Sequence, residues 1–311
     1  MPTWIESASG MDSESTSKSI AASPLSRKFS RREFLKLTVR TTAGAAIAGV
    51  AGFGYVTRIE PFWIDVEHVH LTLPRLPLSF DGYKVAQLSD LHMGGWLTRP
   101  RLEEVVLLTN EQKADLVAIT GDFVSRLSDV VTRDLVEVLG ALKAADGVVA
   151  VLGNHDHWNG ANVVRQVLRD SNIINVSNDV HTLQRSGAQL HIAGVDDIWE
   201  GKDDLDAVLG KLPAQGAALL LAHEPDFADT SAGTGRFDLQ LSGHSHGGQV
   251  VPPFLGPLRL PPYGRKYHTG LYQVGTMLQY TNRGVGMVSP PVRFNCRPEI
   301  TLFTLQAPGV V

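Results

Sequence analysis

The sequence predicts an α/β layered protein, and three observations lead to that class. From about residue 83 onwards, short apolar runs alternate with segments of helical periodicity. Hydrophobic residues make up 43% of the 311-residue chain, which is enough for a large core. Five of the apolar runs end in Asp, Asn or His, the residue types that form sites at strand ends. Strands that alternate with helices favour sheets with helices packed on them.

The N-terminal part is typical of a targeting segment. Residues 1–29 are rich in Ser with scattered charges and are expected to form a disordered extension. Residues 30–58 then combine Ser30-Arg31-Arg32-Glu33-Phe34-Leu35-Lys36 with a Gly/Ala-rich apolar run, which closely resembles a twin-arginine export signal. An ordinary basic helix is the alternative. The apolar run is short for a permanent span, which needs about 20 residues. Cleavage near Ala46-Ile47-Ala48 and retention as a membrane anchor therefore both stay open.

Residues 61–308 are predicted to form one folded domain. The expected strands are residues 62–73, 83–88, 115–120, 147–152, 173–176, 182–184, 189–195, 217–222, 237–242, 270–274, 277–281, 284–288 and 299–304. The expected helices are residues 99–114, 130–144, 161–169 and 205–212. Gly and Pro join the last four strands, so the sheet is expected to become mostly antiparallel at its end.

Composition excludes several classes of protein. The formal net charge of −4 shows no global basic footprint, so no specific nucleic-acid partner is expected. Cys296 is the single cysteine, which excludes an internal disulfide and a Cys-based zinc knuckle and is most simply a small core residue. Any metal must therefore be held by His, Asp, Asn or Glu, and 11 histidines make this feasible.

Polar residues follow five of the expected strands. They are Asp90 with His92, Asp122, Asn154 with His155 and Asp156, His223, and His244 with His246. These oxygen and nitrogen donors suit Mn, Fe or Zn. Two divalent ions ~3.5–4 Å apart need a bridging carboxylate, and Asp122 stands alone after its strand. Taken singly, Asp90, Asp122 and Asn154 are more typical of turns and helix caps than of metal ligands.

Together these blocks resemble a known family. Asp90-x-His92, Gly121-Asp122, Gly153-Asn154-His155-Asp156, His223 and Gly243-His244-Ser245-His246 look like the five signature blocks of the calcineurin-like metallophosphoesterases. The resemblance covers residues 83–249, and residues 294–305 look like the closing strand of the same fold. With the export motif and Gly247-Gly248-Gln249, the chain is most similar to the YkuE-like branch.

The resemblance implies a fold, a ligand set and a reaction. The family fold is a pair of packed mixed β-sheets flanked by helices, a four-layer sandwich. One ion would be held by Asp90, His92, Asp122 and His246, and the other by Asp122, Asn154, His223 and His244. His155 would face the substrate as proton donor or transition-state stabiliser, with Asp156 orienting it. The reaction would be hydrolysis of a phosphomonoester or phosphodiester.

The expected function is therefore a binuclear phosphoesterase that the twin-arginine machinery exports to the periplasm or cell envelope, or that stays anchored to the outer face of the cytoplasmic membrane. Its substrate would be a phosphorylated small molecule or a lipid or envelope component. Two alternatives stay open: hydrolysis of a pyrophosphate bond in a nucleotide- or lipid-linked sugar, and metal-dependent binding without turnover. The sequence leaves membrane association, the native metals and the oligomeric state undetermined.

Several further residues have two interpretations. His157, Trp158 and Trp96 either line the pocket or pack in the core. Residues 263–266 (Tyr-Gly-Arg-Lys) are expected to be a solvated loop, with phosphate binding as the alternative. The remaining histidines are expected on the surface or as hydrogen-bonded core residues: His68, His70, His181, His191 and His268.

Overall fold

A computed structural model describes residues 30–309 of the chain. The disordered extension expected for residues 1–29 lies outside the described residues. The chain divides into two compact units, one ending at Val50 and the other beginning at Ala51.

The described N-terminal part is helix α1, Arg31–Gly54. Its start has a capping box: the Glu33 N–H donates to Ser30 Oγ at 3.2 Å, and the Ser30 N–H donates to the Glu33 carboxylate at 3.0 Å. The motif arginines Arg31 and Arg32 therefore occupy the first turn. Among residues 30–309, no helix is both long enough and apolar enough to cross a lipid bilayer.

Two six-stranded sheets form the centre of the second unit. The first has the order β1 (Asp65–Thr72), β12 (Glu299–Gln306), β2 (Tyr83–Leu88), β3 (Leu116–Thr120), β4 (Val148–Val151), β5 (Ile174–Asn175). The second has the order β10 (Gly270–Val274), β11 (Met277–Thr281), β9 (Leu239–Ser242), β8 (Ala217–Leu221), β7 (Ala188–Gly194), β6 (Asp179–Arg185). Both sheets are mixed, because parallel central strands carry antiparallel pairings at β2–β12, β6–β7 and β10–β11.

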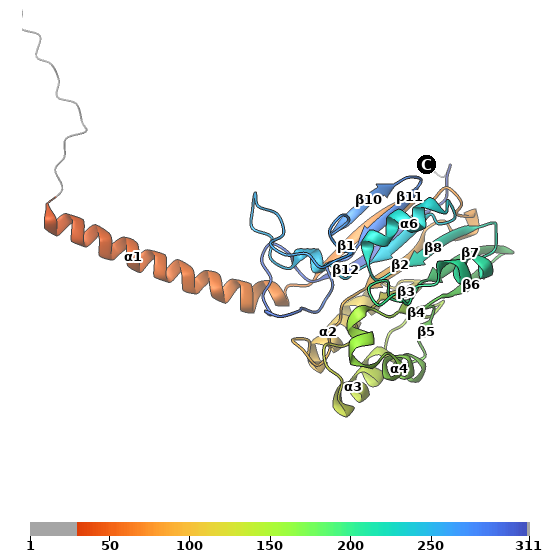
Figure 1. Cartoon of the computed structure of the whole chain (residues 1–311), viewed down its shortest axis with the longest axis horizontal. Helices are drawn as coiled ribbons and strands as arrows, with labels where there is room; N and C mark the ends of the chain where they lie inside the picture. Colours follow the sequence, from red (N-terminus) through yellow and green to blue (C-terminus); the bar gives the residue numbers. More distant parts are fainter. Residues whose placement is uncertain (1–29, 310–311) are drawn as a thin grey trace, which may run out of the picture. The chain divides into compact units, whose positions relative to one another are not determined.

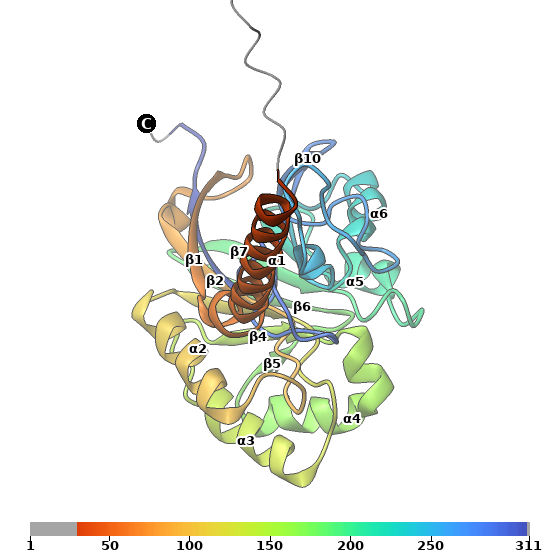
Figure 2. The same ribbon diagram turned by 90° about the vertical axis from the view of Figure 1, so that its left-hand side faces the viewer.

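Helices cover the outer faces of the sheets. They are α2 (Arg99–Glu111), α3 (Asp129–Leu139), α4 (Asn154–Asp170), α5 (Leu205–Lys211) and α6 (Ala228–Gly233). Figures 1 and 2 show α2, α3 and α4 on one side and α6 on the other, and Figure 2 shows α5 on the side of α6. Side chains of both sheets, such as Val149, Leu219 and Phe303, form one buried cluster between them. The predicted α/β fold, two mixed sheets flanked by helices, is confirmed.

The C-terminal part differs from the expectation in two ways. β12 does not continue an antiparallel end but inserts between β1, to which it is parallel, and β2. Residues 284–288 form no strand, because their backbone pairs with a site loop: Val285 and Gly286 donate to the carbonyls of Ser89 and Asp90 at 3.1 and 2.8 Å. A Cβ on Gly286 would collide with the Leu91 carbonyl, so only glycine permits this approach.

Helix α4 begins seven residues earlier than expected, at Asn154 rather than Ala161. The Asp156 carboxylate accepts the Gly153 N–H at 3.0 Å and so caps the N-terminus of α4. Gly160 interrupts the helix with φ 130°. The apolar periodicity begins only after this kink, which is why it marked residues 161–169 alone.

Candidate metal centre

Five strand ends bring the predicted site residues to one edge of the sheets. Asp90 and His92 follow β2, Asp122 follows β3, Asn154 and His155 follow β4, His223 follows β8, and His244 and His246 follow β9. β2, β3 and β4 are parallel to one another, as are β8 and β9, so their carboxyl ends share an edge. Hydrogen bonds tie neighbouring ends together: the His92 N–H donates to the Asp122 carbonyl at 2.9 Å.

The backbone at these strand ends is strained. Asp90, His92, Asp122, His244 and His246 all have left-handed φ values between 51° and 67°. Residues with a Cβ adopt this region at a cost of roughly 1–2 kcal/mol each. Such strain collects at functional sites, where the surrounding structure holds it in place. Each turn here directs a polar side chain inward instead of toward solvent.

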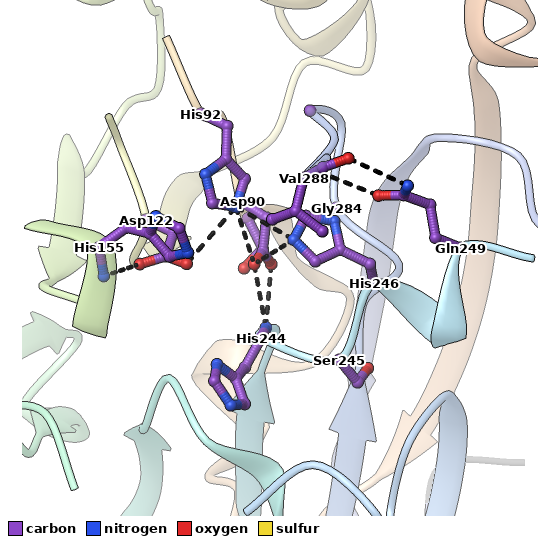
Figure 3. A network of polar contacts seen from close by, with 12 residues as sticks. Asp90, His92, Asp122, His155, His244, Ser245, His246, Gln249, Gly284 and Val288 are labelled. Atoms are coloured by element: carbon purple, nitrogen blue, oxygen red, sulfur yellow. Dashed lines mark hydrogen bonds and ion pairs between the residues drawn. The ribbon is translucent and has the colours of Figure 1, made fainter. Parts of the chain in front are cut away.

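One group of ligand atoms surrounds Asp90 (Figure 3). Single donor atoms of Asp90, His92 and His246 lie within 4.8 Å of one another, and all three residues are buried. The two histidines face each other with their Nε2 atoms 3.0 Å apart. His246 Nε2 is 3.3 Å from Asp90 Oδ1. The backbone N–H of His244 donates to the Asp90 carboxylate at 3.0 Å and so fixes its orientation.

A second buried group contains Asp122, His223 and His244. His223 Nε2 lies 3.3 Å from Asp122 Oδ2 and 3.2 Å from His244 Nδ1. His223 Nδ1 faces the Thr120 carbonyl at 2.6 Å, which leaves Nε2 directed into the group. Asn154 is buried beside it, and its Oδ1 has no hydrogen-bond partner among the described residues. A buried amide oxygen without a donor fits a cation ligand.

Asp122 lies between the two groups. Its Oδ2 is 3.5 Å from His92 Nε2 in the first group and 3.3 Å from His223 Nε2 in the second. Its Oδ1 accepts the backbone N–H of His155 at 2.9 Å, which fixes the carboxylate (Figure 3). One oxygen shared between two groups is the arrangement that a bridging ligand requires.

The electrostatics of the groups also fit metal binding. Burial lowers the pKa values of His92 and His244 to about 3, so both imidazoles are neutral and offer lone pairs near neutral pH. Burial opposes charge on Asp122, yet the adjacent His223 lowers the pKa of the Asp122 carboxyl well below its usual range. His223 differs: burial opposes its charge, yet the Asp122 carboxylate raises the pKa of His223 well above its usual range, so this imidazole would exchange its proton for a metal ion on binding. Carboxylates and imidazole lone pairs gathered in one buried place call for a cation. The residues present therefore fit two divalent ions, although their role as ligands stays a prediction.

Asp156 does not have the contact that was expected of it. Its carboxylate accepts the backbone N–H groups of Phe123, Val124 and Gly153 at 2.8, 3.2 and 3.0 Å, and no hydrogen bond joins it to the His155 ring within residues 30–309. Burial, with a smaller contribution from Asp122, raises the pKa of Asp156 to about 8. Its place is to hold the loop after Asp122, which makes it a positioning residue.

A pocket of about 500 Å³ opens in front of both groups. Asp122, Asn154, His155, His244 and His246 form its inner end. The half-buried His155 ring stands edge-on to His92, with ring centroids 4.7 Å apart. His155 thus lines the pocket with one ligand-type atom within 4.8 Å of donor atoms of His92 and Asp122.

The pocket wall contains residues that the sequence left open or missed. Trp158 lines it, as does Trp199, which had not been predicted. Trp199 lies beyond the end of β7 in the loop that follows, and no polar strand-end pattern indicates an apolar residue there. Glu224 holds this loop by accepting the Trp199 N–H at 3.2 Å. Arg265 lines the pocket too, while Tyr263, Arg265 and Lys266 are exposed, as expected of a solvated loop.

Other candidates lie away from the site. Trp96 packs edge-on against Phe62 and beneath the Arg101 guanidinium, which lies 3.6 Å from the centre of the Trp96 ring. His157 forms an ion pair with Asp196 at 2.8 Å instead of lining the pocket. His191 is a hydrogen-bonded core residue, as expected, since its ring nitrogens meet Thr182 and the Gln215 carbonyl. Cys296 is buried, again as expected.

Comparisons with known proteins agree with this geometry. The sequence pattern of the family described as "Calcineurin-like phosphoesterase" matches residues 83–248, which include every strand-end residue named above. The uncharacterized metallophosphoesterase YkuE of Bacillus subtilis (strain 168) is 37% identical over 90% of this chain and 99% of its own length. The phosphodiesterase YaeI of Escherichia coli (strain K12) is 32% identical over 89% of this chain and 99% of its own.

A solved structure, TT1561 of Thermus thermophilus, aligns with 65% of this chain and 90% of its own at 14% identity and a TM-score of 0.45. The family uses a dinuclear metal site, and the clusters around Asp90 and Asp122 fit one. By its family pattern and by its homology to YkuE, this chain belongs to the calcineurin-like phosphoesterases, hydrolases of phosphoester bonds.

Proposed function

We propose that this protein is a binuclear metal-dependent phosphodiesterase or phosphomonoesterase. The observation that supports this most directly is Asp122 Oδ2, which lies 3.5 Å from His92 and 3.3 Å from His223. Asp90, His92, Asp122 and His246 would hold one ion, and Asp122, Asn154, His223 and His244 the other. Mn, Fe or Zn suits these donors. Two such ions supply positive charge to the phosphoryl oxygens and lower the pKa of water toward neutrality.

The chain's own residues position the reaction. The Asp122 carboxylate is oriented by the His155 N–H, and its loop is held by Asp156. His155 faces the pocket from the first turn of α4 and would give a proton to the departing oxygen. Trp158 and Trp199 form an edge-on aromatic pair, 5.4 Å between centroids, that covers one side of the pocket.

The type of bond is tested by comparing three substrates. The full chain is reconstituted with Mn²⁺ and assayed on a chromogenic phosphomonoester, a chromogenic phosphodiester and a pyrophosphate. We expect the highest kcat/KM on the diester or the monoester. A higher value on the pyrophosphate would transfer the assignment to a pyrophosphate-bond hydrolase. Metal binding with no turnover of any substrate would leave a metal-dependent binding protein.

We also propose that the protein acts outside the cytoplasmic membrane after twin-arginine export. The basis is the Ser30–Lys36 motif, whose two arginines lie at the capped start of α1. The test replaces Arg31 and Arg32 by lysine in the expressed full chain and follows the protein by cell fractionation, with and without a salt wash. Export of the wild type and cytoplasmic retention of the variant support the proposal. Equal distribution of both would contradict it.

A further inference from the structure

The loop after the strand-end histidines presents large apolar side chains to solvent. Residues 251–263 (VPPFLGPLRLPPY), here called the rim loop, follow the last histidine block. Phe254 is fully exposed, and Leu255 and Leu258 are 76% and 64% exposed. Phe254 also has a left-handed backbone, with φ 68°. Because the Phe254 side chain is not buried in the fold, no packing offsets the cost of this backbone conformation.

The rim loop is held in this exposed position. Its Leu258 N–H donates to the Val250 carbonyl at 3.1 Å, and Val251 donates to the Phe294 carbonyl at 2.9 Å. A Cβ on Gly248 would collide with Pro257, so the loop packs tightly against the chain just after His246. Five prolines in the loop restrict its backbone. The apolar tip is thus rigid and close to the candidate metal centre.

The base of the rim loop forms part of the pocket. Leu258, Arg259 and Leu260 line the same pocket as His155 and His244. Residues 250–269 contain three cations, Arg259, Arg265 and Lys266, and no acidic residue. Lys266 pairs with Asp229, whereas the ion pairs of residues 30–309 include neither arginine. The exposed apolar side chains of the rim loop are therefore followed, toward the pocket, by Arg259 and Arg265 and then by the candidate metal centre.

From this sequence of surfaces we infer that the substrate is the phosphodiester headgroup of an anionic membrane lipid, cleaved at the bilayer surface. This rests on the proposed phosphodiesterase function. Phe254 and Leu255 would enter the acyl boundary while Arg259 and Arg265 meet the phosphates. Water adds its hydroxyl to phosphorus and its remaining proton to the departing alcohol oxygen, so one P–O bond forms and one breaks. A second copy of the chain fits less well, because a symmetric dimer through this face would bring Arg259 and Arg265 of both copies together.

A local probe tests insertion of the rim loop. Leu255→Cys in the full chain is labelled with a polarity-sensitive fluorophore, since the native Cys296 is buried. The matched control is Leu78→Cys, which is 71% exposed and precedes β2, at the sheet edge opposite the site. With vesicles of phosphatidylcholine and phosphatidylglycerol, we expect a blue shift at position 255 only, and none with phosphatidylcholine alone. No shift at 255, or equal shifts at both positions, would overturn the inference.

A rate ratio tests the substrate class. Mn²⁺-loaded wild type and the double variant Phe254→Ser/Leu255→Ser are assayed on phosphatidylglycerol in vesicles and on bis(p-nitrophenyl) phosphate. We expect the ratio of lipid rate to soluble rate to fall about tenfold or more in the double variant, but not in Leu78→Ser. A wild type that cleaves only the soluble diester overturns the lipid inference and leaves the proposed function intact. One that cleaves neither diester overturns the inference together with the phosphodiesterase activity on which it rests, and leaves only the phosphomonoesterase form of the proposed function.

Discussion

The two ends of the pocket differ in almost every physical property. The inner end consists of buried carboxylates and imidazoles from strand ends, such as Asp122 and His244, which are 2% and 5% exposed. The outer wall consists of Trp158, on the first turns of α4, and of the rim loop, which contributes Arg259 to the pocket. Phe254 of this loop is fully exposed. The inner end is anchored by two sheets, whereas the outer wall depends on loop contacts.

This difference separates chemistry from selection. Parallel strands place the inner residues with the precision that ligand geometry needs, since a sheet edge fixes several backbones at once. Loops can vary in length and composition without disturbing that edge. We therefore expect changes at the inner end to abolish turnover on every substrate, and changes in the outer wall to alter which substrate is used.

The largest effect is expected from the residue between the two groups. Asp122→Ala removes the oxygen that lies near both His92 and His223. Mutation of a residue that only orients a metal ligand lowers metal affinity or activity about 10–100-fold. Loss of a bridging ligand should cost more, so Asp122→Ala should lower kcat/KM on a chromogenic diester by roughly a thousandfold or more. Unchanged circular dichroism would show that the fold persists. The exposed Asp129→Ala is the control, and wild-type activity in Asp122→Ala would contradict the comparison.

The next effect concerns proton transfer at the boundary between the two ends. His155→Ala should lower kcat by about 10²–10⁴-fold, the range typical of a general acid. Metal content should stay at the wild-type level, because the proposed ligands are untouched. Exposed His70→Ala serves as the matched control. Loss of metal together with activity would instead place His155 among the ligands.

A smaller effect is expected in the outer wall. Trp199 stands edge-on to Trp158 and to His244, with ring centroids 5.4 and 5.5 Å apart. Trp199→Ala should raise KM about 2–10-fold, as the loss of one aromatic contact implies, and change kcat less. Steady-state kinetics on two diesters of different size measure this, with Trp63→Ala as the control. A fall in kcat as large as that of His155→Ala would erase the distinction between the two ends.

The smallest effect is expected at the ion pair of His157 with Asp196, which does not line the pocket. The hydrogen bond from His157 to Asp196 raises the pKa of His157. The protonated pair therefore stabilises the fold below the unfolded pKa of about 6.5, and this contribution disappears as pH rises through the raised folded value. His157→Gln should lose about 1 kcal/mol or less at pH 6 and less still at pH 9, by urea unfolding. A greater loss at pH 9 would contradict the sign.

The same contrast explains what the sequence could predict. Asp90, Asp122, His223 and the two histidines after β9 each follow an apolar run directly, so a local pattern found them. The edge that they share is a general property of parallel strands, which made their convergence predictable as well. The order of the sheets confirmed the fold class, although β12 joined the first sheet.

The features that the sequence did not predict depend on contacts between segments that are distant in the chain. Residues 284–288 have strand-like composition but pair with the loop at Asp90, a partner that no local pattern indicates. The rim loop has the Pro and Gly content of an ordinary connector, and only the folded chain places its base at the pocket. The resemblance implied that Asp156 orients His155, whereas its carboxylate accepts the backbone N–H groups of Phe123 and Val124.

The central claim is that the two buried groups form one dinuclear hydrolytic centre. The most direct measurement counts Mn²⁺ per chain by elemental analysis after desalting, in parallel with hydrolysis of bis(p-nitrophenyl) phosphate. We predict two ions per wild-type chain, a rate that rises with the second ion, and loss of both properties in Asp122→Ala. Full hydrolysis by a chain that a chelator has stripped of metal, or by Asp122→Ala, would contradict the claim.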